Sequence, residues 1–123
     1  MNCIFCKINN GEIPSQILYE DNIVQVIMDV NPTSNGHILI IPIKHYSDFL
    51  NIDDDTLNHI HKIAKLMKKY LYESLNPDGL TLINNYGINQ LIKHYHLHLI
   101  PVYKEKQLIK DTTEIYQKIK SVI

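Results

Sequence analysis

Hydrophobic and polar residues along the chain follow two kinds of pattern, one typical of strands and one of helices. Three short runs rich in β-branched and apolar residues, at 17–20, 23–28 and 37–42, predict β-strands. Turn and loop residues at 21–22 and 31–36 separate these runs. Because strands so close in sequence pair most readily with their neighbours, we expect an antiparallel meander.

Between residues 53 and 75 the apolar positions recur every three or four residues. Acidic residues at 53–55 favour a helix start, and the apolar face from Leu57 to Leu75 predicts an amphipathic helix of about five or six turns. The remaining elements are predicted as a helical turn at 3–8, strands at 80–84 and 91–101, and a terminal helix at 111–123. This order predicts an α+β fold with an antiparallel sheet.

The composition limits the classes of partner. The 123-residue chain has 45% hydrophobic and 20% charged residues, which is typical of a globular domain. A formal net charge of −1 gives no basic field to attract nucleic acid. No apolar run approaches the roughly 18–20 residues that span a bilayer, and the N-terminus lacks a signal-peptide pattern. We therefore expect a cytoplasmic protein with no membrane or nucleic-acid partner.

Three histidines alternate within the predicted strand at 91–101. Because side chains alternate along a strand, His94, His96 and His98 share one face, while Tyr95 and Leu97 face the helix. Such a row of imidazoles is costly to bury without partners. It is compatible with a solvated polar face, with a zinc enzyme that uses His96 and His98 as ligands, or with covalent catalysis by an imidazole.

The two cysteines, Cys3 and Cys6, form a C-x-x-C pattern at the N-terminus. This spacing is typical of half a zinc site or of a redox pair. A redox pair of the thioredoxin type follows a strand and begins a helix, and no strand is predicted before Cys3. The pattern therefore favours the zinc interpretation.

The stretch from His94 to Ile100 matches the H-φ-H-φ-H-φ-φ signature of the histidine triad (HIT) nucleotide-binding family, and the chain resembles the zinc-containing bacterial branch of that family. The resemblance covers nearly the whole chain and also rests on Cys3–Ile8, Gly36-His37, Lys44-His45, Asn76–Gly79 and Gln90. It implies a single HIT domain over residues 1–123, with a five-stranded bent antiparallel sheet, one long helix, a short N-terminal helical turn and a C-terminal helix.

The resemblance also implies a reaction. It is the hydrolysis of nucleoside 5′-phosphoramidates or related nucleotidyl conjugates. His96 would attack the α-phosphorus to form a nucleotidyl-histidine, and water would then release a nucleoside monophosphate. His98 would donate to a non-bridging phosphate oxygen, with Asn85 and Gln90 as further neutral donors. His37 would orient the triad by hydrogen bonding, and no catalytic metal is needed.

The substrate-binding residues implied by the resemblance belong to a purine nucleotide site. Asp29 would accept hydrogen bonds from the two ribose hydroxyls, although a plain turn aspartate is the alternative. Phe5, Ile8, Ile27 and Val30 would form the apolar base pocket, although ordinary core packing explains such residues equally simply.

Four residues match the positions that hold a structural zinc in several branches of the family: Cys3, Cys6, His45 and His94. Two thiolates and two imidazoles suit tetrahedral zinc. His94 is also the first histidine of the triad, so zinc on one of its nitrogens would remove it from a proton relay.

Other functions and the assembly remain open at this level. A dinucleoside polyphosphate hydrolase and a non-catalytic nucleotide-binding regulatory module are the alternatives to the phosphoramidate hydrolase. Only Ile88 and Asn89 lie between Gly87 and Gln90, where family members often have a longer glycine-rich stretch, so the leaving-group preference is open. The apolar strand at 80–84 would be an uncovered edge, and the family commonly pairs it, with the long helix, in a homodimer. We expect a homodimer.

Overall fold

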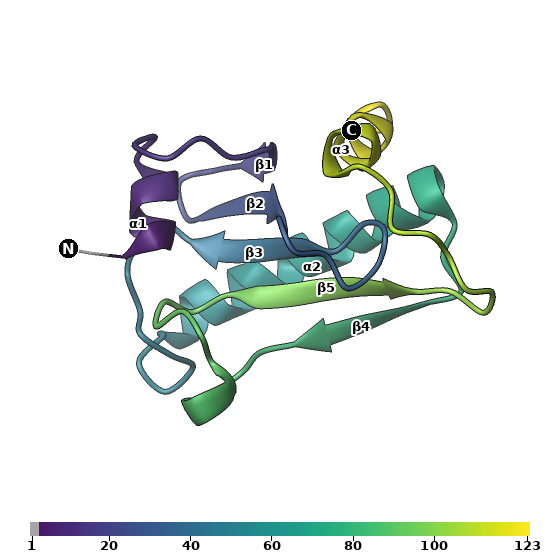
Figure 1. Ribbon diagram of the computed structural model, residues 1–123. Helices are drawn as coiled ribbons and strands as arrows, with labels where there is room; N and C mark the ends of the chain where they lie inside the picture. Colours follow the sequence, from purple (N-terminus) through teal and green to yellow (C-terminus); the bar gives the residue numbers. More distant parts are fainter. Residues whose placement is uncertain (1–2) are drawn as a thin grey trace.

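A five-stranded antiparallel sheet forms the centre of the protein in this computed structural model, which describes residues 3–123 (Figure 1). The elements in chain order are α1 (Ile4–Asn9), β1 (Ile17–Glu20), β2 (Val24–Met28), β3 (Ile38–Pro42), α2 (Asp54–Leu75), β4 (Gly79–Ile83), the 3-10 turn η1 (Gly87–Asn89), β5 (Leu97–Val102) and α3 (Thr112–Lys120). The predicted α+β class, the meander of the first three strands and the long helix are confirmed.

The strand order is β1-β2-β3-β5-β4, so β5 lies between β3 and the edge strand β4. Leu99 of β5 pairs with Ile38 on one side and with Leu82 on the other. This order brings the start of β5 beside β3, although the long helix α2 separates the two strands in sequence. The histidines that precede and begin β5 therefore lie in the middle of the sheet.

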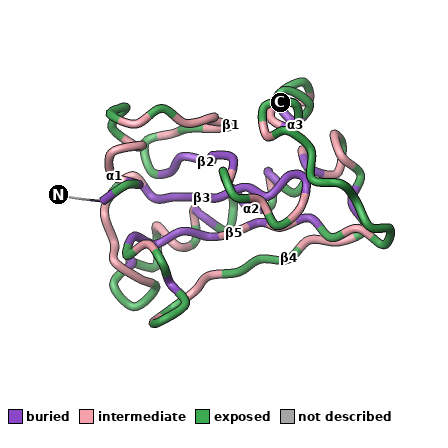
Figure 2. Tube along the Cα trace, in the orientation of Figure 1, coloured by how far each residue is buried: buried purple, intermediate pink, exposed green. Residues whose placement is uncertain are grey.

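Both faces of β2 and β3 are covered, which explains why these strands are almost continuously apolar. Alternate residues such as Val26 and Ile40 pack in the core beneath α2, whereas Ile27 and Leu39 pack with Phe5 of α1 on the opposite face. Figure 2 shows these two strands as the buried centre, while β4 is largely exposed. The main core thus lies between the sheet and α2, and a smaller one lies beneath α1.

The last strand differs from the prediction, because β5 begins at Leu97 and not at residue 91. The last pair of its ladder with β3 is Ile40 with Leu97, and Pro42 further along β3 has no N–H with which to extend the ladder. The backbone just before β5 is bonded elsewhere: the Tyr95 N–H donates to the Tyr46 carbonyl over 2.6 Å, and the Asn84 amide donates to the His96 carbonyl over 3.0 Å. Tyr95 nevertheless packs in the core beneath α2, so the predicted alternation continues into this segment.

Helix α2 begins where the acidic residues predicted it. The Asp53 carboxylate accepts a hydrogen bond from the Thr56 N–H, and Asn76 ends the helix in a left-handed conformation with φ of 48°. Among residues 3–123, none of the helices is both long and apolar enough to cross a membrane.

Candidate functional site

A cavity of about 470 Å³ opens on the side of the sheet that carries α1. Its walls are mostly apolar, and its polar lining includes His96, His98, His37 and Asp29. These four come from three distant parts of the sequence: the start of β5, the residue before β3 and the loop after β2. The pairing of β3 with β5 brings them together.

His96 is held in one tautomer by the backbone. Its Nδ1 lies 2.7 Å from the carbonyl oxygen of His94, and a carbonyl only accepts, so Nδ1 carries the hydrogen. The lone pair of the neutral ring is then on Nε2. Burial lowers the pKa of His96, which keeps the imidazole neutral near pH 7. A neutral ring with a lone pair on Nε2, beside a cavity, is a nucleophile.

His98 lies next to His96, with ring centroids 4.9 Å apart. Its Nδ1 is 2.9 Å from Nε2 of His37, and Nδ1 of His37 accepts a hydrogen bond from the Thr33 N–H over 3.0 Å. Burial, together with the neighbouring His96 and His37, lowers the pKa of His98 to about 4. His98 therefore reaches the cavity as a neutral imidazole at pH 7.

Asp29 is the charged residue among those that line the cavity. One carboxylate oxygen accepts from the Asn31 N–H over 2.8 Å, as a turn aspartate does. The other oxygen lies 3.3 Å from Nε2 of His37 and 3.9 Å from Nδ1 of His98. Asp29 is thus a turn aspartate that also faces the histidines of the cavity, and its contact with the ribose stays a prediction.

The four residues proposed for the base pocket all line the cavity. Phe5 and Ile27 are buried walls, and Phe5 also packs edge-on to the His96 ring at 5.0 Å. Ile8 is partly buried against the same cluster. Val30 is 80% exposed and therefore lies at the rim of the cavity.

The two amide residues predicted as phosphate donors, Asn85 and Gln90, lie in different surroundings. Asn85 lines the cavity, but Gln90 does not: it is 3% exposed, and its side-chain nitrogen donates to the carbonyls of Ser47 over 2.7 Å and Ile92 over 3.1 Å. Both amide hydrogens of Gln90 are therefore used to hold loops together. Asn89, which the sequence did not single out, lines the cavity and donates to the Asn85 side chain over 3.2 Å.

Cys3, Cys6, His45 and His94 converge beneath α1, with ligand atoms within 4.8 Å of one another. Sγ of Cys3 lies 3.3 Å from Nδ1 of His94, and Sγ of Cys6 lies 3.3 Å from Nδ1 of His45. The two Nδ1 atoms are 3.1 Å apart. Around tetrahedral zinc such edges measure about 3.3–3.8 Å, so the cluster is close to the size that zinc requires.

His94 faces this cluster and is absent from the lining of the cavity. Its Nε2 donates to the Pro42 carbonyl over 2.9 Å, which leaves the lone pair on Nδ1, among the sulfur atoms. Burial and the adjacent Cys3 raise the pKa of the Cys6 thiol to about 11, so a cation is needed to stabilise its thiolate. The donor set and the lone pair of His94 on Nδ1 both fit zinc.

A second group of possible metal ligands lies at the cavity itself, where Asp29, His37 and His98 have ligand atoms within 4.8 Å of one another. It does not match the zinc-enzyme alternative, which requires His96 and His98 as ligands. His96 is not part of this cluster, whose third ligand is the Asp29 carboxylate.

An antiparallel sheet with a cavity lined by histidines places the protein in a class that is also found among known families. The family model of the HIT domain matches residues 10–105, and the chain belongs to the HIT domain family. It is similar to an uncharacterized HIT-like protein of Methanocaldococcus jannaschii, with 39% identity over 129 residues that cover 96% of this chain and 98% of that protein.

Two further relatives carry more specific names. An adenosine 5′-monophosphoramidase of Candida albicans is 40% identical over 106 residues, which cover 81% of this chain and 70% of that protein. The crystal structure of a zinc-bound histidine triad family protein from Mycobacterium smegmatis has a TM-score of 0.91 and 29% identity, and the match covers 98% of this chain and 92% of that one.

Proposed function

We propose that this chain is a nucleotide hydrolase that cleaves nucleoside 5′-phosphoramidates or related nucleotidyl conjugates through a nucleotidyl-histidine at His96. The observation that carries this proposal is the 2.7 Å hydrogen bond from Nδ1 of His96 to the His94 carbonyl, which leaves a lone pair on Nε2 of a cavity-lining residue. An imidazole in this state attacks phosphorus without a separate strong base.

The reaction has two displacements at phosphorus. Nε2 of His96 attacks the α-phosphorus, the bond to the leaving group breaks, and the departing amine takes up a proton from solvent. Water then attacks the same phosphorus, the bond to Nε2 breaks, and a proton of that water returns to solvent. A nucleoside monophosphate leaves and the neutral imidazole is restored. The neutral His98 donates to a non-bridging oxygen while negative charge increases there.

The nucleoside would occupy the rest of the cavity. The apolar surfaces of Phe5, Ile8 and Ile27 suit a purine ring, and Val30 would cover it from the rim. The second oxygen of Asp29 suits a ribose hydroxyl, and Asn85 adds a neutral polar group. The name of the similar Candida albicans protein, an adenosine 5′-monophosphoramidase, supports adenosine as the nucleoside.

Cys3, Cys6, His45 and His94 would hold a structural zinc ion, which the zinc-bound Mycobacterium smegmatis relative supports. When bound, zinc supplies a crosslink and no reaction step. These ligands connect α1, which carries Phe5 into the cavity, to the loop after β3 and to the segment before β5. We place the protein in the cytoplasm, where the thiols stay reduced.

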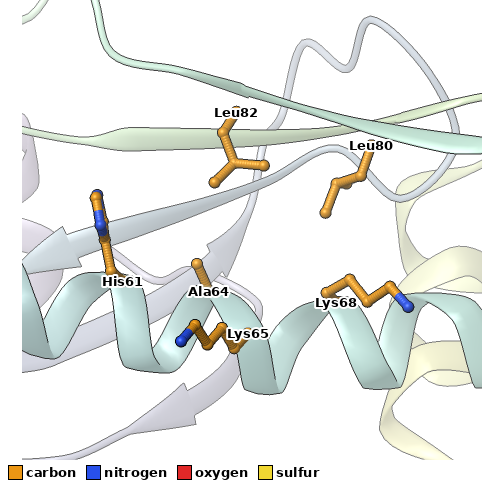
Figure 3. A pocket seen from close by; sticks show the side chains of 6 residues that line it. All are labelled: His61, Ala64, Lys65, Lys68, Leu80 and Leu82. Carbon is orange, nitrogen blue, oxygen red and sulfur yellow. The ribbon is translucent and has the colours of Figure 1, made fainter.

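We further propose that the chain is one HIT domain that assembles as a homodimer through α2 and β4. The edge strand β4 and the helix border an apolar hollow lined by Leu80, Leu82, Ala64 and the stems of Lys65 and Lys68, with His61 beside them (Figure 3). Leu82 is half exposed, and an exposed apolar edge strand is a pairing site. Light scattering at micromolar concentration tests this assembly, and a monomer would overturn it.

Intact-protein mass spectrometry during hydrolysis of an adenosine phosphoramidate tests the catalytic proposal. Wild type should release adenosine monophosphate and carry one transient nucleotidyl group, and His96→Ala should do neither. His59→Ala removes an imidazole of α2 that lines neither the cavity nor the hollow at β4, so it is the matched control and should release product and carry the adduct as wild type does. If wild type binds the nucleotide without an adduct or product, a regulatory binding module replaces the hydrolase.

A further inference from the structure

Asp29, His37 and His98 have the composition of a common metal site, two imidazoles and a carboxylate with an open side. The distances also suit a metal. Nε2 of His37 and Nδ1 of His98 are 2.9 Å apart, and the Asp29 oxygen lies 3.3 and 3.9 Å from them. Ligand atoms around a first-row transition metal are about 3.0–3.4 Å apart. Distance alone therefore does not decide whether this cluster binds a metal.

The position of the ring hydrogen of His37 decides whether this cluster can bind a metal. The Thr33 backbone N–H points at Nδ1 of His37 over 3.0 Å, and an amide N–H can only donate. Nδ1 must then hold a lone pair, and the single hydrogen of neutral His37 is on Nε2. Nε2 is the atom that faces Asp29 and His98, and a metal ligand needs its lone pair there. Metal binding would require the Thr33 hydrogen bond to break.

We propose that the Thr33 N–H is a positioning group that sets the tautomers of both His37 and His98 and keeps this cluster a hydrogen-bond chain rather than a metal site. His37 donates from Nε2 to Nδ1 of His98, so the hydrogen of His98 is on Nε2, the nitrogen left for the cavity. The part of this inference that concerns hydrolysis rests on the proposed function, since His98 Nε2–H would be the donor to the phosphate. The tautomers themselves do not.

The loop that carries Thr33 is fixed at several points. The Asp29 N–H donates to the His37 carbonyl over 3.1 Å, and the Ser34 hydroxyl donates to the Pro101 carbonyl over 2.6 Å. Gly36 has φ of +93°, and a Cβ at this position would lie 2.5 Å from a Leu75 methyl group. These contacts hold the Thr33 amide against His37, so the direction of its N–H is part of the fold.

Nitrogen-15 NMR of the histidine rings in the zinc-loaded full chain, without substrate, tests the tautomers directly. We expect wild type to show hydrogen on Nε2 of both His37 and His98, and on Nδ1 of His96. A His37 ring with its hydrogen on Nδ1 would overturn the proposal. Because no substrate is present, this result is independent of whether the chain is a hydrolase.

Two variants separate the Thr33 amide from its side chain. Thr33→Ala keeps the N–H and should leave the ring tautomers of His37 and His98 as they are in wild type. Thr33→Pro removes the N–H, and we expect a mixture of His37 tautomers, a kcat on phosphoramidate lowered about 10- to 100-fold with little change in KM, and Co²⁺ binding at a second site per chain. A folded Thr33→Pro protein with wild-type tautomers would contradict the proposal. If this variant does not fold, the wild-type ring spectrum decides.

Discussion

The two clusters of metal-ligating side chains differ in the backbone group that each central histidine meets. In the cluster beneath α1, Nε2 of His94 donates to the Pro42 carbonyl, and the lone pair faces the cysteines. At the cavity, Nδ1 of His37 accepts from the Thr33 amide, and a hydrogen faces the other ligands. In these two clusters the carbonyl partner thus leaves a lone pair facing the other ligands, as a metal requires, while the amide partner leaves a hydrogen there.

The largest expected effect is loss of the proposed zinc. Cys6→Ser should lower the zinc content from one ion per chain to near zero and lower the melting temperature by about 10 °C or more, because metal binding contributes directly to folding. Elemental analysis and thermal unfolding measure both. Asp29→Asn, which alters only the cavity cluster, is the matched control and should retain its zinc. Zinc loss in the Asp29 variant, or retention in the Cys6 variant, would reverse the assignment of the two clusters.

The second largest expected effect is on kcat, and it comes from removing Nε2 of His98, the nitrogen that faces the cavity. A glutamine side chain can place an N–H near the ε position, whereas asparagine ends one bond earlier. His98→Asn should therefore lower kcat by about 10²- to 10³-fold, the cost of a lost oxyanion donor, and His98→Gln should recover part of it. Steady-state kinetics with a phosphoramidate measure both variants. Equal losses would mean that the ε nitrogen is not the donor.

The acid stability of the protein should also depend on the cavity histidines. His98 faces His96, His37 and Asp29, and its pKa falls from 6.5 to about 4 in the folded state, where burial is the main cause. The unfolded chain therefore binds a proton at His98 more readily than the folded protein does. Above about pH 6.5 His98 is neutral in both states and does not change the free energy of unfolding. As the pH drops from about 6.5 to 4, the free energy of unfolding falls. We expect about 1–3 kcal/mol from this residue.

Urea unfolding at several pH values between 7 and 4 measures this loss. His98→Gln cannot titrate, so its stability should fall less steeply over the same range. Zinc release contributes in both proteins and cancels in the difference. If the two curves run parallel, the pKa of His98 is near its ordinary value in the folded protein.

Hydrophobic periodicity was sufficient to predict the strands up to β4 and the long helix, because β2, β3 and the helix bury apolar residues and β4, although exposed, is an apolar run. It placed the start of β5 too early, because the ladder with β3 ends at the Ile40–Leu97 pair and the Tyr95 N–H before it donates to Tyr46, a distant contact that periodicity does not show. The histidines and Asp29 at the cavity could be named from the histidine pattern and the family resemblance, but Asn89 was missed. Thr33 could not, because it acts through a backbone N–H that every residue except proline possesses.

Gln90 provides the smallest expected effect on activity and separates resemblance from geometry. If Gln90 donated to the phosphate, its removal would lower kcat strongly. In the structure, however, its amide donates to the carbonyls of Ser47 and Ile92. Gln90→Ala should therefore cost about 1–3 kcal/mol of stability, the value of two buried hydrogen bonds, and lower kcat less than about fivefold. Denaturant unfolding and phosphoramidate kinetics measure the two quantities. A loss of kcat near that of His98→Asn, at unchanged stability, would mean that the loop rearranges with substrate and brings Gln90 to the phosphate.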